Sequence, residues 1–137
     1  MIHTVKELRC HLQGPTLENW HQLRRAARYL QGTKDAWLIL ERNPEDTVPD
    51  AVNLRVQVDA DHAGDVGTRK STTCVLARTD GMTTVCTSKA QSVIATSSGE
   101  GEFYGIGSGL VEGLGIQSIL KELGMKVELT IECDSSA

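Results

Sequence analysis

Four short segments of β-forming residues, interrupted by one long helical segment, constrain the fold of this chain most strongly. Residues 53–59 and 127–133 alternate apolar and polar side chains, which is the pattern of a half-buried strand. Residues 71–79 and 82–88 are rich in Thr and Val and are separated by Asp80-Gly81. Asp-Gly between two such runs predicts a β-hairpin, because a type I′ turn needs positive φ at both central residues.

The longest periodic segment, residues 98–123, has apolar residues at helical spacing. Ser97 or Ser98 is a candidate N-cap and Gly124 a candidate terminator. Seven glycines lie inside or beside this segment, namely Gly99, Gly101, Gly105, Gly107, Gly109, Gly113 and Gly115. Each interior glycine costs about 1 kcal/mol relative to alanine. The helix is therefore either weak or packed very closely on the sheet, and the sequence allows both.

An N-terminal helix is predicted over residues 16–31, with Thr16 as its N-cap and Gly32 where a C′ glycine ends a helix. Its basic stripe is either a solvated face or a contact for a nucleic-acid backbone; the stripe consists of Arg24, Arg25 and Arg28.

The segment after this helix contains the predicted domain boundary. Residues 37–40 are expected to form a short strand or helix tail, and residues 43–51, with two prolines and three acids, predict a loop. We divide the chain into a helical, basic domain, 1–50, and a second domain, 51–137.

Composition excludes several classes of protein. The chain has 137 residues, of which 39% are hydrophobic and 23% charged, so one globular domain with an appendage is expected. No apolar run reaches the length of about 20 residues that a membrane helix needs, and the N-terminus lacks a secretory signal. Four cysteines without a C-x-x-C pair argue against a zinc ribbon or disulfide scaffold. We expect an intracellular protein of the cytoplasm or nucleus, neither secreted nor membrane-bound.

Charge is distributed unevenly along the chain. Residues 1–34 hold six Lys/Arg and two Asp/Glu, whereas the remainder holds eight and sixteen, and the formal net charge is −4. A passive nucleic-acid binder is usually basic. An acidic domain is compatible with an enzyme that meets phosphates through divalent cations bound by carboxylates.

The predicted order β-β-β-α-β brings distant acids together. The helix connection makes the fourth strand parallel to the first, with a right-handed crossover. If these strands are neighbours, Asp59 and Asp134 lie at the same edge of the sheet, and Glu100 or Glu102 lies in the first turn of the helix. Three converging carboxylates repel one another unless a cation joins them, and Mg²⁺ is the natural candidate. The alternative is that these residues are ordinary surface acids.

At these positions the sequence resembles the ribonuclease H domain of copia-type LTR retrotransposon Pol polyproteins. The matching blocks lie in the family's order and spacing over most of the chain: Trp20 with residues 23–33, Asp59-Ala60-Asp61-His62-Ala63-Gly64-Asp65, Arg69-Lys70-Ser71-Thr72, Ser88-Lys89 with Gln91, residues 95–104, and Cys133-Asp134-Ser135-Ser136-Ala137. The resemblance also implies that residues 1–50 are the end of the reverse transcriptase connection.

The resemblance implies an α/β fold with a mixed sheet in strand order 3-2-1-4-5, of which this chain would lack the last strand and helix. It implies Mg²⁺-dependent hydrolysis of the RNA strand of RNA–DNA hybrids. Asp59, Glu102 and Asp134 would be the catalytic carboxylates and would hold two Mg²⁺ ions. The remainder of a Pol polyprotein would be a further partner.

Four other residues, Arg69, Lys70, Ser71 and Ser97, are predicted to contact nucleic acid, since phosphate contacts position a duplex. The alternatives are an exposed polar loop end for the first three and a helix cap for Ser97. His62, where the family has Trp, is a proton shuttle or a surface replacement. Because the family's fourth carboxylate lies in the later helix, a second function hypothesis stays open. It is a catalytically inactive fragment of a retroelement polyprotein with at most weak nucleic-acid binding.

Overall fold

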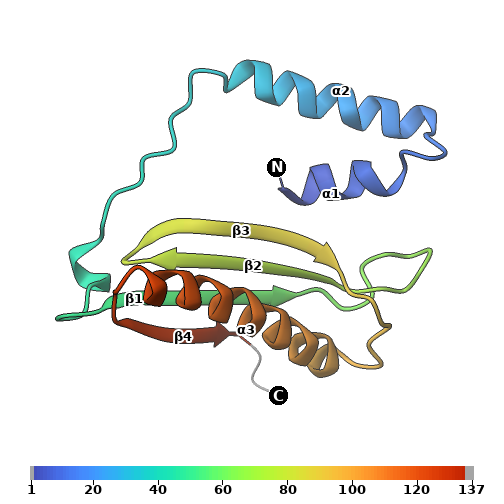
Figure 1. Cartoon of the computed structure of the whole chain (residues 1–137). Helices are drawn as coiled ribbons and strands as arrows, with labels where there is room; N and C mark the ends of the chain where they lie inside the picture. The colour runs from blue at the N-terminus through green and yellow to red at the C-terminus, as the bar shows by residue number, and fades with distance from the viewer. Residues whose placement is uncertain (1, 135–137) are drawn as a thin grey trace. The chain divides into compact units, whose positions relative to one another are not determined.

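The computed structural model describes residues 2–134, which divide into two compact units, 2–39 and 40–134 (Figure 1). The first unit contains helices α1 (Ile2–Cys10) and α2 (Leu17–Gly32). The second contains a short 3-10 helix (Pro44–Asp46), strands β1 (Val52–Ala60), β2 (Thr72–Thr79), β3 (Met82–Ala90) and β4 (Val127–Cys133), and helix α3 (Ser98–Glu122). Each of the four predicted strands and both predicted helices is present.

The sheet has the order β3-β2-β1-β4. Strands β1, β2 and β3 are antiparallel neighbours, and β4 lies parallel to β1 with Val58 opposite Cys133. The chain crosses from β3 to β4 through α3, which lies along one face of the sheet (Figure 1). This arrangement confirms the predicted mixed sheet and is consistent with a ribonuclease H-like core.

The hairpin between β2 and β3 turns at the predicted position. Asp80 and Gly81 have φ values of 50° and 85°, the two positive values that a type I′ turn requires. Asp80 also fastens the preceding loop, because its carboxylate accepts hydrogen bonds from Arg42 Nε (2.9 Å) and from the backbone N–H of Asn53 (2.9 Å). This explains why residues 40–50 cluster with the sheet unit, although the sequence analysis placed them before the boundary at residue 50.

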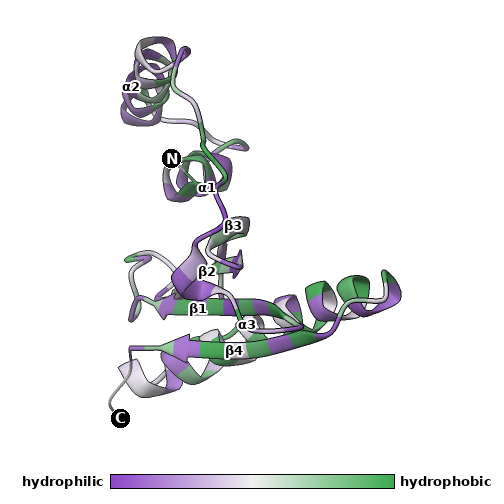
Figure 2. Cartoon of the chain, turned by 90° about the vertical axis from the view of Figure 1, so that its left-hand side faces the viewer, coloured by the Kyte–Doolittle hydropathy of each residue, from purple (hydrophilic) through white to green (hydrophobic). Residues whose placement is uncertain are grey.

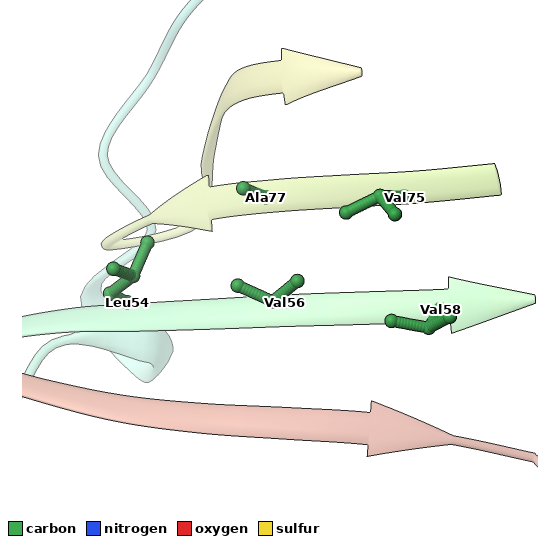
Figure 3. Packing of buried hydrophobic residues seen from close by; sticks show 5 residues of the cluster. All are labelled: Leu54, Val56, Val58, Val75 and Ala77. Carbon is green, nitrogen blue, oxygen red and sulfur yellow. The ribbon is translucent and has the colours of Figure 1, made fainter. Parts of the chain in front are cut away.

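The core of the sheet unit lies between β1, β2 and α3. Leu54, Val56 and Val58 from β1 pack with Val75 and Ala77 from β2 (Figure 3). Around them are partly buried apolar residues of β3, α3 and β4, namely Val85, Ile116, Val127, Leu129 and Ile131. Alternation along the strands therefore sorts the side chains as predicted.

Helix α3 presents glycine to the sheet. A Cβ atom on Gly109 would lie 2.3 Å from Val58 Cγ2, and one on Gly113 would lie 3.0 Å from Leu129 Cδ1. On another side of the helix, Gly107 and Gly115 have nothing within 4 Å of such an atom. The structure thus decides between the two possibilities left open by the sequence: the helix packs very closely, through glycines four residues apart.

Several large apolar residues of α3 are exposed, whereas Ile116 packs against the core. Phe103, Val111 and Ile119 are largely exposed, and Figure 2 shows hydrophobic colour over much of this helix. A helix that is apolar on all sides is normally enclosed by protein. In the described part of the sheet unit, protein covers the side of α3 that carries Gly105, Gly109 and Gly113.

The helical unit contains one element that the sequence analysis missed. None of the residues of helix α1 is buried. In α2, the predicted N-cap is confirmed, since Thr16 Oγ1 accepts a hydrogen bond from the N–H of Asn19 (3.2 Å). Gly32 is the last helical residue instead of the C′ residue, and Thr33 is the C-cap. Residues 37–40 form neither a strand nor a helix, contrary to expectation.

Candidate functional site

Glu102, Cys133 and Asp134 form a group of possible metal ligands at one end of the sheet. One ligand atom from each residue lies within 4.8 Å of the others. Glu102 comes from the start of α3, whereas Cys133 ends β4 and Asp134 follows it. Thirty residues of sequence separate the helix acid from the strand end, so the crossover between β3 and β4 is what brings them together.

The fold buries Glu102 at this position. Only 8% of its surface is exposed, and its Oε2 accepts a hydrogen bond from Cys133 Sγ at 3.2 Å. Among residues 2–134, no Lys, Arg or His side chain lies within 4.0 Å of the Glu102 carboxylate. A buried carboxylate normally has a cationic partner, because desolvation of the charge is costly.

The first turn of α3 is anchored to the sheet, which fixes the place of Glu102. Gln91 Nε2 donates hydrogen bonds to the carbonyl oxygen of Gly101 (2.8 Å) and to Thr73 Oγ1 (2.9 Å). Because the Gly101 carbonyl oxygen can only accept a hydrogen bond, the Gln91 amide must turn its NH₂ group toward it. The backbone immediately before Glu102 is therefore tied to β2.

The neighbouring acid Glu100 has a different role. Its Oε2 accepts hydrogen bonds from the hydroxyl and backbone N–H of Thr96, both at 2.6 Å, and its Oε1 accepts one from the Tyr104 hydroxyl at 2.9 Å. The Thr96 side chain, then its backbone N–H, then Tyr104 lower the pKa of Glu100. The same hydrogen bond, with the charge of Glu100, raises the pKa of Tyr104. Glu100 thus closes the start of α3, and Glu102 is the acid placed beside Asp134.

Asp59 lies outside the group of three ligands. It is exposed in β1 and follows Val58, whose partner is Cys133. Strand alternation puts Asp59 on the face opposite the α3-packed side chain of Val58. That face also carries Arg55, whose Nε lies 3.0 Å from Glu132 Oε1. The parallel register brings the ends of β1 and β4 together, and the group of three ligands does not include Asp59.

The other predicted site residues lie near the start of β2 and of α3. Arg69, with φ of 58°, is exposed and Lys70 is partly exposed. Ser71 is fully buried, and its Oγ accepts a hydrogen bond from the N–H of Ala63 at 3.0 Å. Ser97 is the N-cap of α3, where its Oγ accepts from the N–H of Glu100 at 3.1 Å. The hydroxyls of both serines thus hold backbone within the sheet unit.

Two further side chains of the block Asp59-Ala60-Asp61-His62-Ala63-Gly64-Asp65 have different surroundings. His62 is exposed. Asp61, the second aspartate of this block, accepts a hydrogen bond through Oδ1 from the backbone N–H of Thr72. Asp61 therefore fastens the loop before β2.

Cys133 is the site residue that the sequence analysis did not select. Its position at the end of β4 places its thiol close to both the helix acid and the final aspartate. The signal was available in the sequence: Cys133 precedes a candidate ligand at the end of a strand. The two carboxylates suit a hard cation such as Mg²⁺, whereas a thiol suits softer metals.

Comparison with known proteins gives two long matches. The chain is 31% identical over 138 residues to the retrovirus-related Pol polyprotein from transposon TNT 1-94 of Nicotiana tabacum, covering 100% of this chain and 10% of that protein. It is 30% identical over 137 residues to the Pol polyprotein from transposon RE2 of Arabidopsis thaliana, covering 98% and 9%. These matches relate the chain to retrotransposon Pol polyproteins, of which it spans about a tenth.

A third match covers less of the chain. It is 36% identical over 92 residues to secreted RxLR effector protein 161 of Plasmopara viticola, covering 67% of this chain and 61% of that protein. No protein-family model and no solved structure matches the chain. Among the described residues, none of the helices combines the length and apolar character that crossing a bilayer demands.

Proposed function

We propose that the sheet unit is a ribonuclease H-type nuclease module of a copia-type retroelement Pol polyprotein. Its reaction would be hydrolysis of the RNA strand of an RNA–DNA hybrid. The observation that carries the proposal is the meeting of Glu102 and Asp134, which lie far apart in sequence, at the carboxyl end of parallel strands. In sheets with parallel strands, ligand sites gather at this end. The similarity to Pol polyproteins supports the same proposal.

Mg²⁺ is the proposed cofactor, because Glu102 and Asp134 offer hard oxygen ligands. Bound divalent ions would supply an activated water and stabilise the leaving oxygen of a phosphodiester. Glu102 is held in place by its burial and by the anchored first turn of α3. Asp134 is exposed beside it, where it is accessible to a substrate. Asp59, at the end of the neighbouring strand, is the third proposed carboxylate.

Hybrid binding is proposed for Arg69 and Lys70, which lie in the loop before β2. Both are accessible, and contacts between basic side chains and phosphates position a duplex without recognising its sequence. Ser71 is fully buried, so the proposed contact uses the two basic residues. The helical unit would be the end of the reverse transcriptase connection, and the rest of the polyprotein its partner.

The test is cleavage of a hybrid with a labelled RNA strand, with and without Mg²⁺. Wild type is expected to cleave only with Mg²⁺, and Glu102→Gln, Asp134→Asn and Asp59→Asn are expected to lose cleavage. Glu100→Gln is the matched control, because it removes a carboxylate from the same helix turn without touching the site. Equal cleavage by wild type and Glu102→Gln would overturn the proposal.

A non-catalytic, weakly binding module is the second candidate, favoured by the absence of Asp59 from the group of three ligands. The same preparations distinguish the two functions. Hybrid binding by wild type, measured by fluorescence anisotropy, without cleavage at any Mg²⁺ concentration would support this candidate. Loss of hybrid binding in the double variant Arg69→Ala/Lys70→Ala would then show that these two residues contact the hybrid.

A further inference from the structure

Cys133 gives the carboxylate site a third ligand of a different chemical kind. Its Sγ lies 3.2 Å from Glu102 Oε2, and the ligand atoms of Cys133, Glu102 and Asp134 lie within 4.8 Å of one another. A site for a hard ion alone has no use for a thiol, because Mg²⁺ prefers oxygen. Thiolate ligands select Zn²⁺ and other soft or borderline ions.

The surroundings of Glu102 leave it without a basic partner among the described residues. This carboxylate is more than nine-tenths buried. Among the side chains that the structure describes, its hydrogen-bond donor is the Cys133 thiol, a weak donor. No basic side chain of residues 2–134 forms an ion pair with it. A cation bound by Cys133 and Glu102 would give this buried carboxylate a positively charged partner in place of the neutral thiol.

Cys133 Sγ and Glu102 Oε2 lie slightly closer together than two ligands of a small tetrahedral ion, so an ion would widen this contact. A sulfur at about 2.3 Å and a carboxylate oxygen at about 2.1 Å from Zn²⁺ would lie about 3.6 Å apart. The observed separation is 3.2 Å. Three protein ligands with one open position is the ligand number of catalytic zinc sites. Because Asp134 is exposed, the open position would face solvent.

We propose that Glu102, Cys133 and Asp134 form a binding site for a thiophilic divalent cation of the Zn²⁺ class, which competes with Mg²⁺ for the same carboxylates. The inference rests on the proposed function in that it treats this pair of carboxylates as a cation site. It adds that Cys133 decides which cation is preferred. Zn²⁺ would thus regulate the module by occupying the place of Mg²⁺.

The experiment uses the full chain and Cd²⁺ as a spectroscopic probe for Zn²⁺. Cd²⁺ is titrated while the sulfur-to-metal charge-transfer absorption is recorded, and Zn²⁺ affinity is measured by competition. Wild type is expected to show the band with the first equivalent of metal. Cys133→Ser is expected to lose that band and to bind Zn²⁺ at least about tenfold more weakly, since loss of outer-shell partners alone weakens metal binding 10–100-fold.

Cys86→Ser is the matched control, because Cys86 is an exposed β3 cysteine away from the group. It should retain the band and the affinity. Asp134→Asn, at an exposed position that leaves the core intact, should weaken Zn²⁺ binding while retaining a folded circular dichroism spectrum. An unchanged band and affinity in Cys133→Ser would overturn the inference.

The readout separates this inference from the nuclease proposal. Metal binding that depends on Cys133, without hybrid cleavage, would contradict the nuclease proposal and support the thiophilic site. Cleavage with Mg²⁺ and no Cys133-dependent Zn²⁺ binding would do the reverse. If both proposals hold, Zn²⁺ should inhibit Mg²⁺-dependent cleavage in wild type, and Cys133→Ser should resist this inhibition.

Discussion

The sheet unit and the helical unit use similar apolar side chains but bury them very differently. In β1, Leu54 and Val56 are 0% exposed. In the helical unit, Leu12 and Leu17 are 72% and 73% exposed, and within residues 2–39 only Ala26 is buried. In the sheet unit, the apolar side chains of one strand face pack against neighbouring strands and α3. The two helices of the helical unit bury almost no side chain. Stability of this chain should therefore reside in the sheet unit.

The largest expected effect is on the core of that unit. Leu54→Ala should lower the free energy of unfolding by about 2–5 kcal/mol, because it removes transfer energy and leaves a cavity. Leu12→Ala should change it by no more than about 0.5 kcal/mol, as expected for a surface position. Urea unfolding followed by circular dichroism measures both. Similar losses for the two variants would mean that the helical unit has a core of its own.

Glycines of α3 allow the same comparison within one helix. Gly109→Ala places a methyl group against Val58 and should destabilise the unit by about 1–3 kcal/mol through overpacking. Gly107→Ala meets nothing within 4 Å and should stabilise it by up to about 1 kcal/mol through helix propensity. Thermal unfolding of the two single variants provides the measurement. Stabilisation by both would show that α3 does not pack as closely as described.

The helix caps test whether local stability is transmitted within each unit. Ser97→Ala removes the cap of α3 and should lower the unfolding free energy by about 1 kcal/mol. Thr16→Ala removes the α2 cap and should reduce helicity in the first unit without moving the main unfolding transition. Amide hydrogen exchange of each helix distinguishes these outcomes. A shift of the main transition by Thr16→Ala would show that the two units unfold together.

The smallest effect concerns pH. Since hydrogen bonds from Thr96 and Tyr104 lower the pKa of Glu100, its contribution to stability is complete above the ordinary Glu pKa and is lost as pH falls through the lower folded value. Tyr104→Phe removes one of these bonds and should bring the Glu100 pKa partly back toward its ordinary value. An NMR titration of the Glu100 side-chain carboxyl tests this. Titration of Glu100 above its ordinary pKa would contradict the described cap.

Much of the sheet unit was predictable from residues close together in sequence. Asp80-Gly81 specified the hairpin turn, and Ser97 marked the start of α3. Helix α1 was not predicted, and none of its residues is buried. For residues 37–40 the prediction was wrong, because four consecutive apolar residues are typical of a strand or helix. In the structure these residues are exposed and form neither.

The candidate site was predictable only in part. The crossover rule predicted that β4 runs parallel to β1, the structure shows that the two are neighbours, and the resemblance selected Glu102 over Glu100. Periodicity alone had no means of showing that Asp59 would lie outside the group or that Cys133 would lie within it. Which side chains share a site depends on the face of each strand and on the depth of the helix start.

By itself, the sequence determined the order of the elements from β1 to β4 and the mixed sheet, because these follow from local periodicity, turn chemistry and handedness. The tertiary structure decided how closely α3 approaches the sheet, since only facing side chains show that Gly109 has no room for a methyl group. It also decided the membership of the site, because distances of a few ångströms between β4 and α3 arise from packing that no local pattern encodes.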